Sequence, residues 1–157
     1  MNWDTRLGPK RQLRVGLAWS GRPTNKNDQN RSIWLSSLLS LLDIEATFVS
    51  LQKDIRTDDV TILKDRSDIL HFGDALENFS DTAALISNLD LVISVDTRVA
   101  HLAGALAKPV WVLLPFVPDW HWLLDRNDSP WYPTARLFRQ DDARAWDNVI
   151  ARSCCPV

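Results

Sequence analysis

The sequence predicts an α/β protein in which a parallel sheet carries helices on both of its faces. Strand-like and helix-like segments alternate along the 157 residues, which is typical of a parallel sheet with helical crossovers. The runs LVISV (91–95) and PVWVLL (109–114) are continuously apolar, as expected of strands buried on both faces. Ligands of such sheets bind beyond the carboxyl ends of the strands, so the loops after the strands are the expected location of a site.

The order of elements follows from hydrophobic periodicity and turn signals. Strands are expected at 13–19, 46–52, 68–74, 91–96, 109–115 and 135–140. Helices are expected at 36–44, 81–89, 97–107 and 144–153, with Asp81 as the N-cap of the second. The charged segment 53–68 is expected to be mostly loop.

The chain length suggests a single domain. Residues 1–12 are polar and basic and are expected to be a linker or an N-terminal extension, residues 13–153 one domain, and residues 154–157 a tail. The tail holds adjacent Cys154 and Cys155, which we interpret as reduced thiols because neighbouring cysteines rarely bridge.

Composition argues against several classes of partner. The net charge of -2 provides no general attraction to nucleic acid or acidic membranes. No apolar run approaches the roughly 20 residues that span a bilayer, and the N-terminal segment lacks the apolar stretch of a secretory signal. A cytoplasmic protein without a membrane span or a nucleic-acid partner is therefore expected.

Polar residues follow the strand at 91–96 abruptly. Asp96, Thr97 and Arg98 lead into the helix at 97–107, and His101 lies one turn further on. The first turn of a helix presents unpaired backbone N–H groups and a positive dipole end, which suit a phosphate. Thr97, Arg98 and His101 can all donate to such a group. An ordinary helix cap beside a surface histidine fits the same residues.

The apolar residues of that helix recur at helical spacing. Val99, Leu102, Ala103 and Leu106 form a stripe that is expected to face the sheet. His101 then lies on a different face of the helix, together with Arg98.

A second candidate is the polar loop at 20–34, after the first strand. Gly21 permits a sharp turn or a close approach to a ligand, and Lys26 and Arg31 supply cations. The loop is either an anion clamp or an ordinary solvated loop. It is not a P-loop, because GxxxxGK[ST] is absent.

A third candidate is the loop at 116–134, which is rich in proline and tryptophan. Asp119, Trp120, His121 and Trp122 are consecutive there. Aromatic planes beside a carboxylate suit a sugar or a base, and they equally suit packing against another domain. The sequence has no GxGxxG motif, no nucleophile elbow, and no acidic pair spaced for metal-dependent glycosyl transfer.

Several motifs in order resemble one family. VGLAWSG, NKNDQNRSI, FVSLQKD and the long run DTAALISNLDLVISVDTRVAHLAGALAKPVWVLLP are similar to the C-terminal portion of bacterial tetratricopeptide-repeat glycosyltransferases. These enzymes are related to the ADP-heptose:lipopolysaccharide heptosyltransferases. The resemblance covers about residues 13–150. It implies a Rossmann-like domain, the donor-binding half of a GT-B glycosyltransferase, with a nucleotide-diphosphate-sugar as substrate and no metal or other cofactor.

The resemblance also implies roles for the residues of the Asp-Thr-x-x-x-His-Leu motif. Thr97, Arg98 and Val99 would offer first-turn donors to the donor diphosphate, His101 would reach a phosphate and stabilise it, and Asp96 would face a sugar hydroxyl.

The same resemblance extends to two loops outside that motif. Lys26 or Arg31 would bind phosphate, and Gln52 or Lys53 would lie beside the nucleoside. One departure is Arg98, since relatives usually carry a small residue there. Arg98 therefore either strengthens phosphate binding or fills the site.

The other departure is that the chain matches only half of the GT-B fold. The acceptor domain and the usual catalytic base of relatives precede position 13, so no catalytic residue is assigned. One hypothesis is a donor-binding half that needs a missing N-terminal glycosyltransferase or tetratricopeptide-repeat domain. The other is a non-catalytic assembly module that docks a partner through its tryptophan-rich face. Either one predicts some self-association through an exposed apolar face.

Overall fold

A six-stranded sheet, all of whose strands run parallel, forms the centre of the molecule. The computed structural model describes residues 3–21, 28–53, 55–66, 68–118, 122–123 and 126–154. The strand order is β3-β2-β1-β4-β5-β6. The strands are β1 (Leu13–Ala18), β2 (Ala46–Ser50), β3 (Ile69–His71), β4 (Leu91–Val95), β5 (Val110–Leu114) and β6 (Ala135–Arg139).

This order identifies the fold as Rossmann-like and confirms the predicted fold class. The chain winds outward from β1 to β3 and then returns to the centre at β4, so the order reverses between β1 and β4. At such a reversal the crossovers leave on opposite faces of the sheet, and a crevice opens beyond the carboxyl ends of the two strands.

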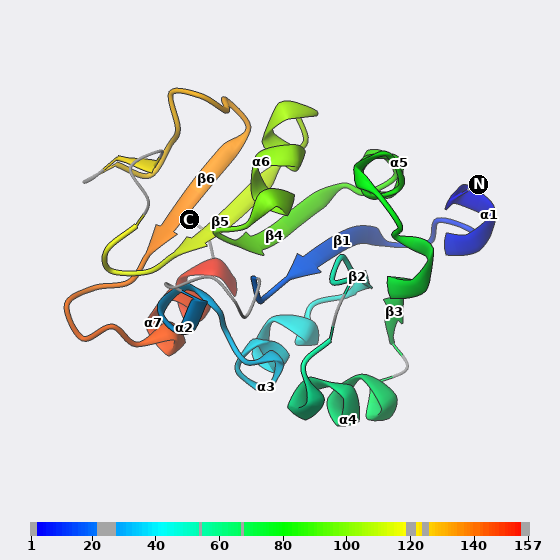
Figure 1. Ribbon diagram of the computed structural model, residues 1–157, viewed down its shortest axis with the longest axis horizontal. Coiled ribbons are helices and arrows are strands. Elements are labelled where there is room, and N and C mark those ends of the chain that lie inside the picture. The colour runs from blue at the N-terminus through cyan, green and yellow to red at the C-terminus, as the bar shows by residue number, and fades with distance from the viewer. Residues whose placement is uncertain are drawn as a thin grey trace.

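Helices cover both faces of the sheet (Figure 1). They are α1 (Trp3–Leu7), α2 (Asp28–Arg31), α3 (Leu35–Leu38), η1 (Leu39–Asp43), α4 (Thr57–Asp65), η2 (Gly73–Ala75), α5 (Phe79–Ser87), α6 (Arg98–Ala105) and α7 (Trp146–Cys154).

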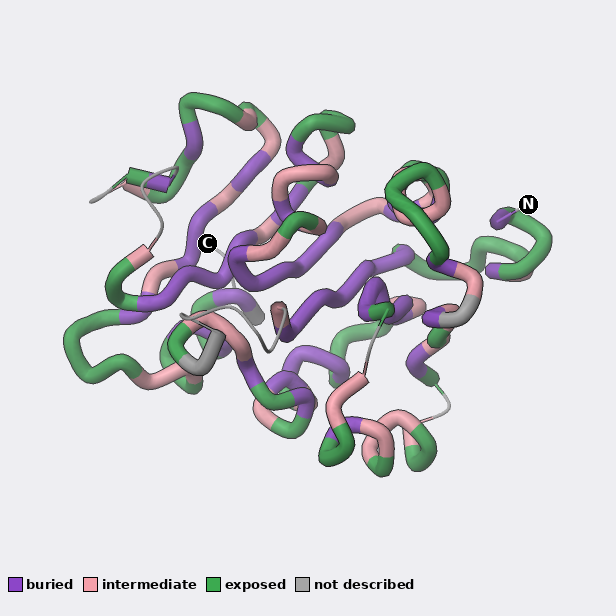
Figure 2. Tube along the Cα trace, viewed as in Figure 1, coloured by how far each residue is buried: buried purple, intermediate pink, exposed green. Residues whose placement is uncertain are grey.

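The hydrophobic core lies in two layers, one on each face of the sheet. Leu85 of α5 and Ala103 of α6 belong to one layer, and Leu41 of η1 and Val149 of α7 belong to the other. The central strands are buried along nearly their whole length (Figure 2). Burial on both faces explains why the sequences of β4 and β5 are continuously apolar rather than alternating.

The segment 53–68 was expected to be mostly loop, and that prediction is wrong because it contains the nine-residue helix α4. Its apolar side is small, with Ile62 and Leu63 partly buried against the core. The inward-facing Asp59 is 1% exposed and accepts hydrogen bonds from Trp19 Nε1 (2.9 Å) and Leu35 N (3.2 Å). A buried carboxylate on the core side hides the apolar stripe from sequence periodicity.

Helix α5 begins two residues earlier than expected. Its N-cap is Asn78, whose side chain accepts from Asp81 N, while the Asp81 carboxylate accepts from Asn78 N. This reciprocal pair is a capping box. Asp81 is therefore the third helical residue and not the N-cap that the sequence suggested.

Helix α6 presents a different face to the sheet than the predicted stripe. The buried residues are Ala100, Ala103 and Gly104, whereas Leu106 is exposed. Val99 and Leu102 are only partly buried, because they line a cleft. Small residues on the buried face bring α6 close to the sheet.

The segment expected as a linker contains α1, which packs on the domain. Trp3 and Leu7 are buried in the core layer that also holds α5 and α6. Arg14, at the start of β1, fixes the segment by donating from Nη2 to Gly8 O (2.8 Å) and from Nη1 to Asp4 Oδ1 (3.2 Å). At the other end, α7 extends to Cys154, and residues 155–157 lie outside the described residues.

Candidate functional site

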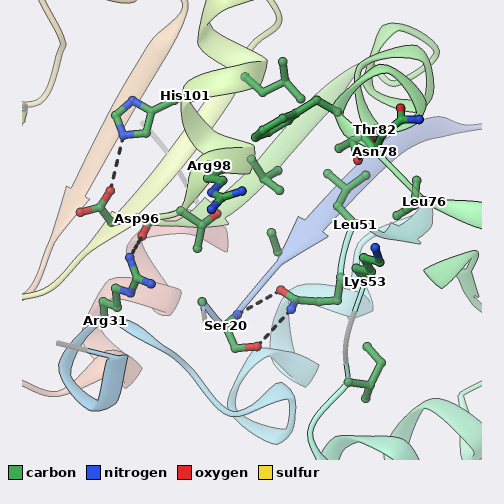
Figure 3. A pocket seen from close by; sticks show the side chains of 18 of the residues that line it. Ser20, Arg31, Leu51, Lys53, Leu76, Asn78, Thr82, Asp96, Arg98 and His101 are labelled. Carbon is green, nitrogen blue, oxygen red and sulfur yellow. Dashed lines mark hydrogen bonds and ion pairs between the residues drawn. The ribbon is translucent and has the colours of Figure 1, made fainter. Parts of the chain in front are cut away.

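A cleft of about 860 Å³ opens at the carboxyl ends of β1, β2 and β4, at the reversal of strand order. This is where Rossmann-like sheets bind ligands, and the volume suits a nucleotide-sized molecule. Its walls come from the segments after these strands and from the N-terminal ends of α5 and α6. Figure 3 shows Asp96, His101 and Arg31 on one side of the cleft and Lys53, Leu76, Asn78 and Thr82 on the other.

Arg31 joins the loop after β1 to the end of β4. Its Nη1 donates to Asp96 O over 2.9 Å (Figure 3). The guanidinium lies directly against Gly21, where an added Cβ would come within 2.3 Å of Arg31 Nη2. A side chain at position 21 would require the Arg31 guanidinium to shift from its place in the wall of the cleft.

Thr97 is the N-cap of α6, but its side chain caps no backbone N–H group. Its Oγ1 lies 3.2 Å from Ser94 Oγ instead. The next residue, Arg98, is exposed, and its guanidinium carbon lies 5.6 Å from the ring centroid of Phe79 at the start of α5. The first turn of α6 thus faces the cleft with a cation on it and no side-chain cap from Thr97.

His101, one turn into α6, is held by polar and aromatic contacts. Its Nδ1 lies 3.0 Å from Tyr132 OH, and its Nε2 lies 3.8 Å from Asp96 Oδ1. The ring stacks on Trp122 with centroids 5.0 Å apart and an interplanar angle of 24°. The imidazole is one third exposed and lines the cleft.

Gln52 braces the wall formed by the ends of β1 and β2. Its Oε1 accepts from Trp19 N (2.9 Å) and Ser20 N (3.1 Å), and its Nε2 donates to Ser20 Oγ (3.1 Å). The structure places Gln52 in the cleft wall with both ends of its amide engaged by the protein. A buried polar group satisfied in this way fixes the relative position of two loops.

The cleft carries a surplus of positive charge in a chain whose net charge is negative. Lys53 donates from Nζ to Glu77 O (3.4 Å), and Arg56 donates from Nη2 to Ser32 Oγ (3.3 Å). The lining residues include Arg31, Lys53, Arg56 and Arg98, against the carboxylates of Glu77 and Asp96. Concentrating cations in a concave site favours an anionic ligand.

Most of the site residues predicted from the sequence line the cleft, one lies behind it, and three lie outside the described residues. Asp96, Thr97, Arg98, Val99, His101, Arg31, Gln52 and Lys53 all line the cleft. Trp122 lies behind His101, fully buried. Lys26, Asp119 and Trp120 lie outside the described residues.

Sequence reasoning missed Tyr132, Arg56 and Phe79. Tyr132 is 31 positions from His101 in a loop between two prolines, so no local spacing connects them. Arg56 stands in a segment interpreted as loop, and Phe79 precedes the predicted start of α5. For Arg56, the available signal was a cation that follows shortly after the end of a strand.

Comparison with known proteins points to one family. The model of glycosyltransferase family 9 (heptosyltransferase) matches residues 77–113, which cover α5, β4, α6 and most of β5. Protein FlbA of Caulobacter vibrioides is 26% identical over 164 residues, and the match covers 96% of this chain. The chain spans 26% of the length of that relative. The family match and the sheet together support a glycosyltransferase-like fold.

Two further features of the described residues bear on ligands and membranes. No helix among them is long and apolar enough to cross a bilayer. Within the same ranges, no cluster of three or more His, Cys, Asp or Glu side chains is arranged to hold a metal ion.

Proposed function

We propose that this chain is the donor-binding domain of a GT-B glycosyltransferase, and that the cleft binds the diphosphate of a nucleotide-sugar. The observation that carries the proposal is the cation-rich cleft at the first turn of α6, and this turn belongs to the segment that matches glycosyltransferase family 9. A helix N-terminus and several guanidinium or ammonium groups complement a diphosphate in charge and in hydrogen bonding.

In this proposal, different residues of the cleft contact the diphosphate and the sugar of the donor. The N–H groups of Arg98 and Val99, the Thr97 hydroxyl, and the side chains of Arg31 and Arg98 would hold the diphosphate. Asp96 would accept from a hydroxyl of the transferred sugar, and Lys26 would add a further cation to the phosphates.

On the other side of the cleft, Lys53 would lie beside the nucleoside, because it stands after β2, away from α6 (Figure 3). Gln52, whose amide is engaged with Trp19 and Ser20, would shape that wall rather than read the base.

Such a site would assist transfer by stabilising the diphosphate as it leaves. Fixed cations and N–H dipoles that face developing negative charge lower the barrier, because they need no reorganisation during the reaction. In this proposal Arg31, Arg98 and the α6 dipole take the part that a divalent metal plays in other transferases. His101 would add a hydrogen bond to a phosphate oxygen, as a stabiliser and not as an assigned acid or base.

The transfer itself would need groups from outside this domain. We infer that an acceptor-binding domain, with or without a tetratricopeptide array, completes the cleft from the other side in the working enzyme. The domain on its own would then bind donor without turning it over.

Thermal unfolding against a panel of nucleoside diphosphates and their sugars tests the proposal. Ligand at about a hundred times its dissociation constant adds about 2.7 kcal/mol to the unfolding free energy. For this chain length that is a rise in Tm of about 5–10 °C. The Thr97→Ala and Arg98→Ala variants should show a smaller shift at the same ligand concentration. Arg136→Ala is the matched control, because Arg136 also lies over an aromatic ring, that of Phe138, but does not line the cleft.

The outcome for Arg98 also settles its role. Weaker binding by Arg98→Ala assigns Arg98 to the diphosphate, whereas tighter binding means that its side chain fills the site. No shift with any ligand, from a sample that unfolds cooperatively, would count against a donor site in this domain.

A second candidate function is a non-catalytic assembly module. It is favoured by large apolar side chains that stay exposed: Phe116 (42%) and Val117 (64%) after β5, and Trp131 (60%) before β6. An assembly module would self-associate or bind a partner domain without responding to nucleotides. Light scattering across a range of protein concentrations, with and without the nucleotide panel, separates the two functions.

A further inference from the structure

Tyr132 lies outside the segment matched by the family and outside the lining of the cleft, yet it contacts the histidine of that cleft. We propose that Tyr132 is a positioning residue: its hydroxyl holds the imidazole of His101 in the tautomer that carries hydrogen on Nε2 and turns that nitrogen toward Asp96 and the cleft. The orientation of His101 is argued from its contacts alone, and only the effect of Tyr132 on ligand binding rests on the proposed function.

The position of the Tyr132 ring is fixed by the surface of α6. A Cβ at Gly104 would lie 2.5 Å from Tyr132 Cγ, so the ring packs where only a glycine leaves room. Ser129 Oγ accepts from Tyr132 N over 3.3 Å and holds the backbone of the loop. Gly104 is three residues after His101, and residues three apart on a helix are neighbours on its surface. The tyrosine ring therefore lies beside the imidazole and not beneath it.

Trp122 fixes the imidazole from a second direction. It is fully buried, and its ring stacks on His101 and lies 6.1 Å from that of Tyr132. The Tyr132 ring meets the imidazole edge-on at 66°, which directs the hydroxyl to Nδ1 at 3.0 Å. Stacking on one side and a hydrogen bond at one edge together define the plane and the rotation of the imidazole.

The Tyr132 hydroxyl and the Asp96 carboxylate favour the same tautomer of His101. Asp96 Oδ1, 3.8 Å from Nε2, favours hydrogen on that nitrogen, because a lone pair facing a carboxylate is repelled. In a neutral imidazole Nδ1 is then the acceptor. A tyrosine hydroxyl is able to donate, so the bond runs from Tyr132 OH to Nδ1. Tyr132, in the loop before β6, thereby favours hydrogen on Nε2, the nitrogen on the opposite side of the His101 ring.

This arrangement serves an anionic ligand. With hydrogen on Nε2, His101 presents a donor beside Asp96, at the edge of the cleft where the proposed diphosphate and sugar meet. Removing the tyrosine hydroxyl removes the 3.0 Å hydrogen bond at Nδ1, and the tautomer with hydrogen on Nδ1 becomes accessible. That tautomer would present a lone pair to the phosphate, and a donor to the ligand would be lost.

Nitrogen-15 NMR of the histidine side chains in the unliganded protein tests the positioning directly. The chain has three histidines, so His101→Gln assigns the signals. At about pH 8.5, well above the ordinary histidine pKa of about 6.5, wild type should show hydrogen on Nε2 of His101. Tyr132→Phe should show a mixture or the other tautomer. Trp131→Phe, which changes an exposed neighbour in the same loop, should match wild type.

Calorimetric titration with inorganic pyrophosphate tests the consequence. Tyr132→Phe keeps the ring on Gly104 and Trp122, so its unfolding temperature should stay close to that of wild type. Its affinity for pyrophosphate should fall roughly threefold to tenfold, the worth of one hydrogen bond. Unchanged affinity in this variant would overturn the role of Tyr132 at the ligand.

The two proposals fail in different ways. A wild-type tautomer with hydrogen on Nδ1, or an unchanged tautomer in Tyr132→Phe, would overturn the positioning role whether or not any ligand binds. Absence of pyrophosphate and nucleotide binding by wild type, together with the expected change in tautomer, would overturn the proposed donor site and the ligand consequence while leaving Tyr132 as the residue that orients His101.

Discussion

Helices α5 and α6 both have their N-termini at the same cleft, but only α5 has a side-chain cap. At α5, Asn78 and Asp81 form a capping box, and Asp81 Oδ2 also accepts from Glu77 N (3.1 Å). At α6, the Thr97 side chain accepts from no backbone N–H and contacts Ser94 instead. The first turn of α5 is capped by its own side chains, whereas the N-cap side chain of α6 caps no backbone N–H group.

The difference bears on how a binding site is recognised in a fold of this kind. Helix N-termini are common, and a capped one has few N–H groups left to offer. An end without a side-chain cap, with Arg31 and Arg98 beside it, combines a helix N-terminus with positive charge. A stabilising cap and a binding site compete for the same N–H groups, so changes at the two helix ends should separate stability from affinity.

The largest expected effect comes from placing an anion at the α6 end. Thr97→Asp should cap the helix and raise the unfolding free energy by about 0.5–1 kcal/mol. The same carboxylate would face the diphosphate, and like charges in a site cost several kcal/mol, so affinity should fall on the order of 100-fold. Calorimetry with pyrophosphate and chemical denaturation measure the two effects on one sample.

Thr97→Asn is the matched control, because asparagine caps as well as aspartate but adds no charge. It should be as stable as Thr97→Asp and bind better than it. If Thr97→Asp bound pyrophosphate as tightly as wild type, the end of α6 would not be a phosphate site, and the contrast between the two helices would carry no functional meaning.

The complementary change, at the capped end, should affect stability alone. Asp81→Ala removes the acceptor for Glu77 N and Asn78 N and an acidic group from the first turn of α5. The expected loss is about 1 kcal/mol of unfolding free energy. Asp81 does not line the cleft, so pyrophosphate affinity should stay within about twofold of wild type. A large loss of affinity would mean that the two ends are not independent.

The sheet could be predicted because its signals are local. The continuously apolar runs of β4 and β5 report burial on both faces, and each strand was placed to within three residues at either end. Helix α4 could not be predicted, because the burial of Asp59 depends on Trp19 and Leu35, which are distant in sequence. Its charged residues resemble a loop until those partners are known.

The candidate site shows the same division. Asp96, Thr97, Arg98, Val99 and His101 could be placed in a cleft from the sequence, because they follow a strand and open a helix. The role of Gln52 as a brace could not, since its partners lie on another strand end. The Tyr132 contact depends on a long loop returning to α6, and periodicity says nothing about where such a loop returns. What each residue touches required the fold.

The smallest expected effect lies at the amino ends of the strands, on the side of the sheet opposite the cleft. There, as at α5, polar groups form hydrogen bonds within the protein. Asp90, just before β4, accepts from Arg14 N (2.9 Å) and from Lys10 Nζ (2.7 Å). Burial acts to raise the pKa of Asp90, but these hydrogen bonds and the charges of Lys10 and Lys108 outweigh it, so the pKa lies below the ordinary 3.8. The ionised carboxylate therefore stabilises the folded state.

Asp90→Asn should lower the unfolding free energy at pH 7 by about 1 kcal/mol or less, because a neutral amide keeps part of the hydrogen bonding. A lowered pKa gives stability that is fully present above the ordinary value of 3.8 and is lost as pH falls through the folded-state pKa. The difference between wild type and variant should thus shrink below pH 3.8 in urea unfolding, with pyrophosphate affinity unchanged at pH 7. If the difference in unfolding free energy between wild type and variant stayed constant with pH, the ionised carboxylate of Asp90 would not be the group that stabilises the fold. The comparison between this end of the sheet and the capped end of α5 would then fail.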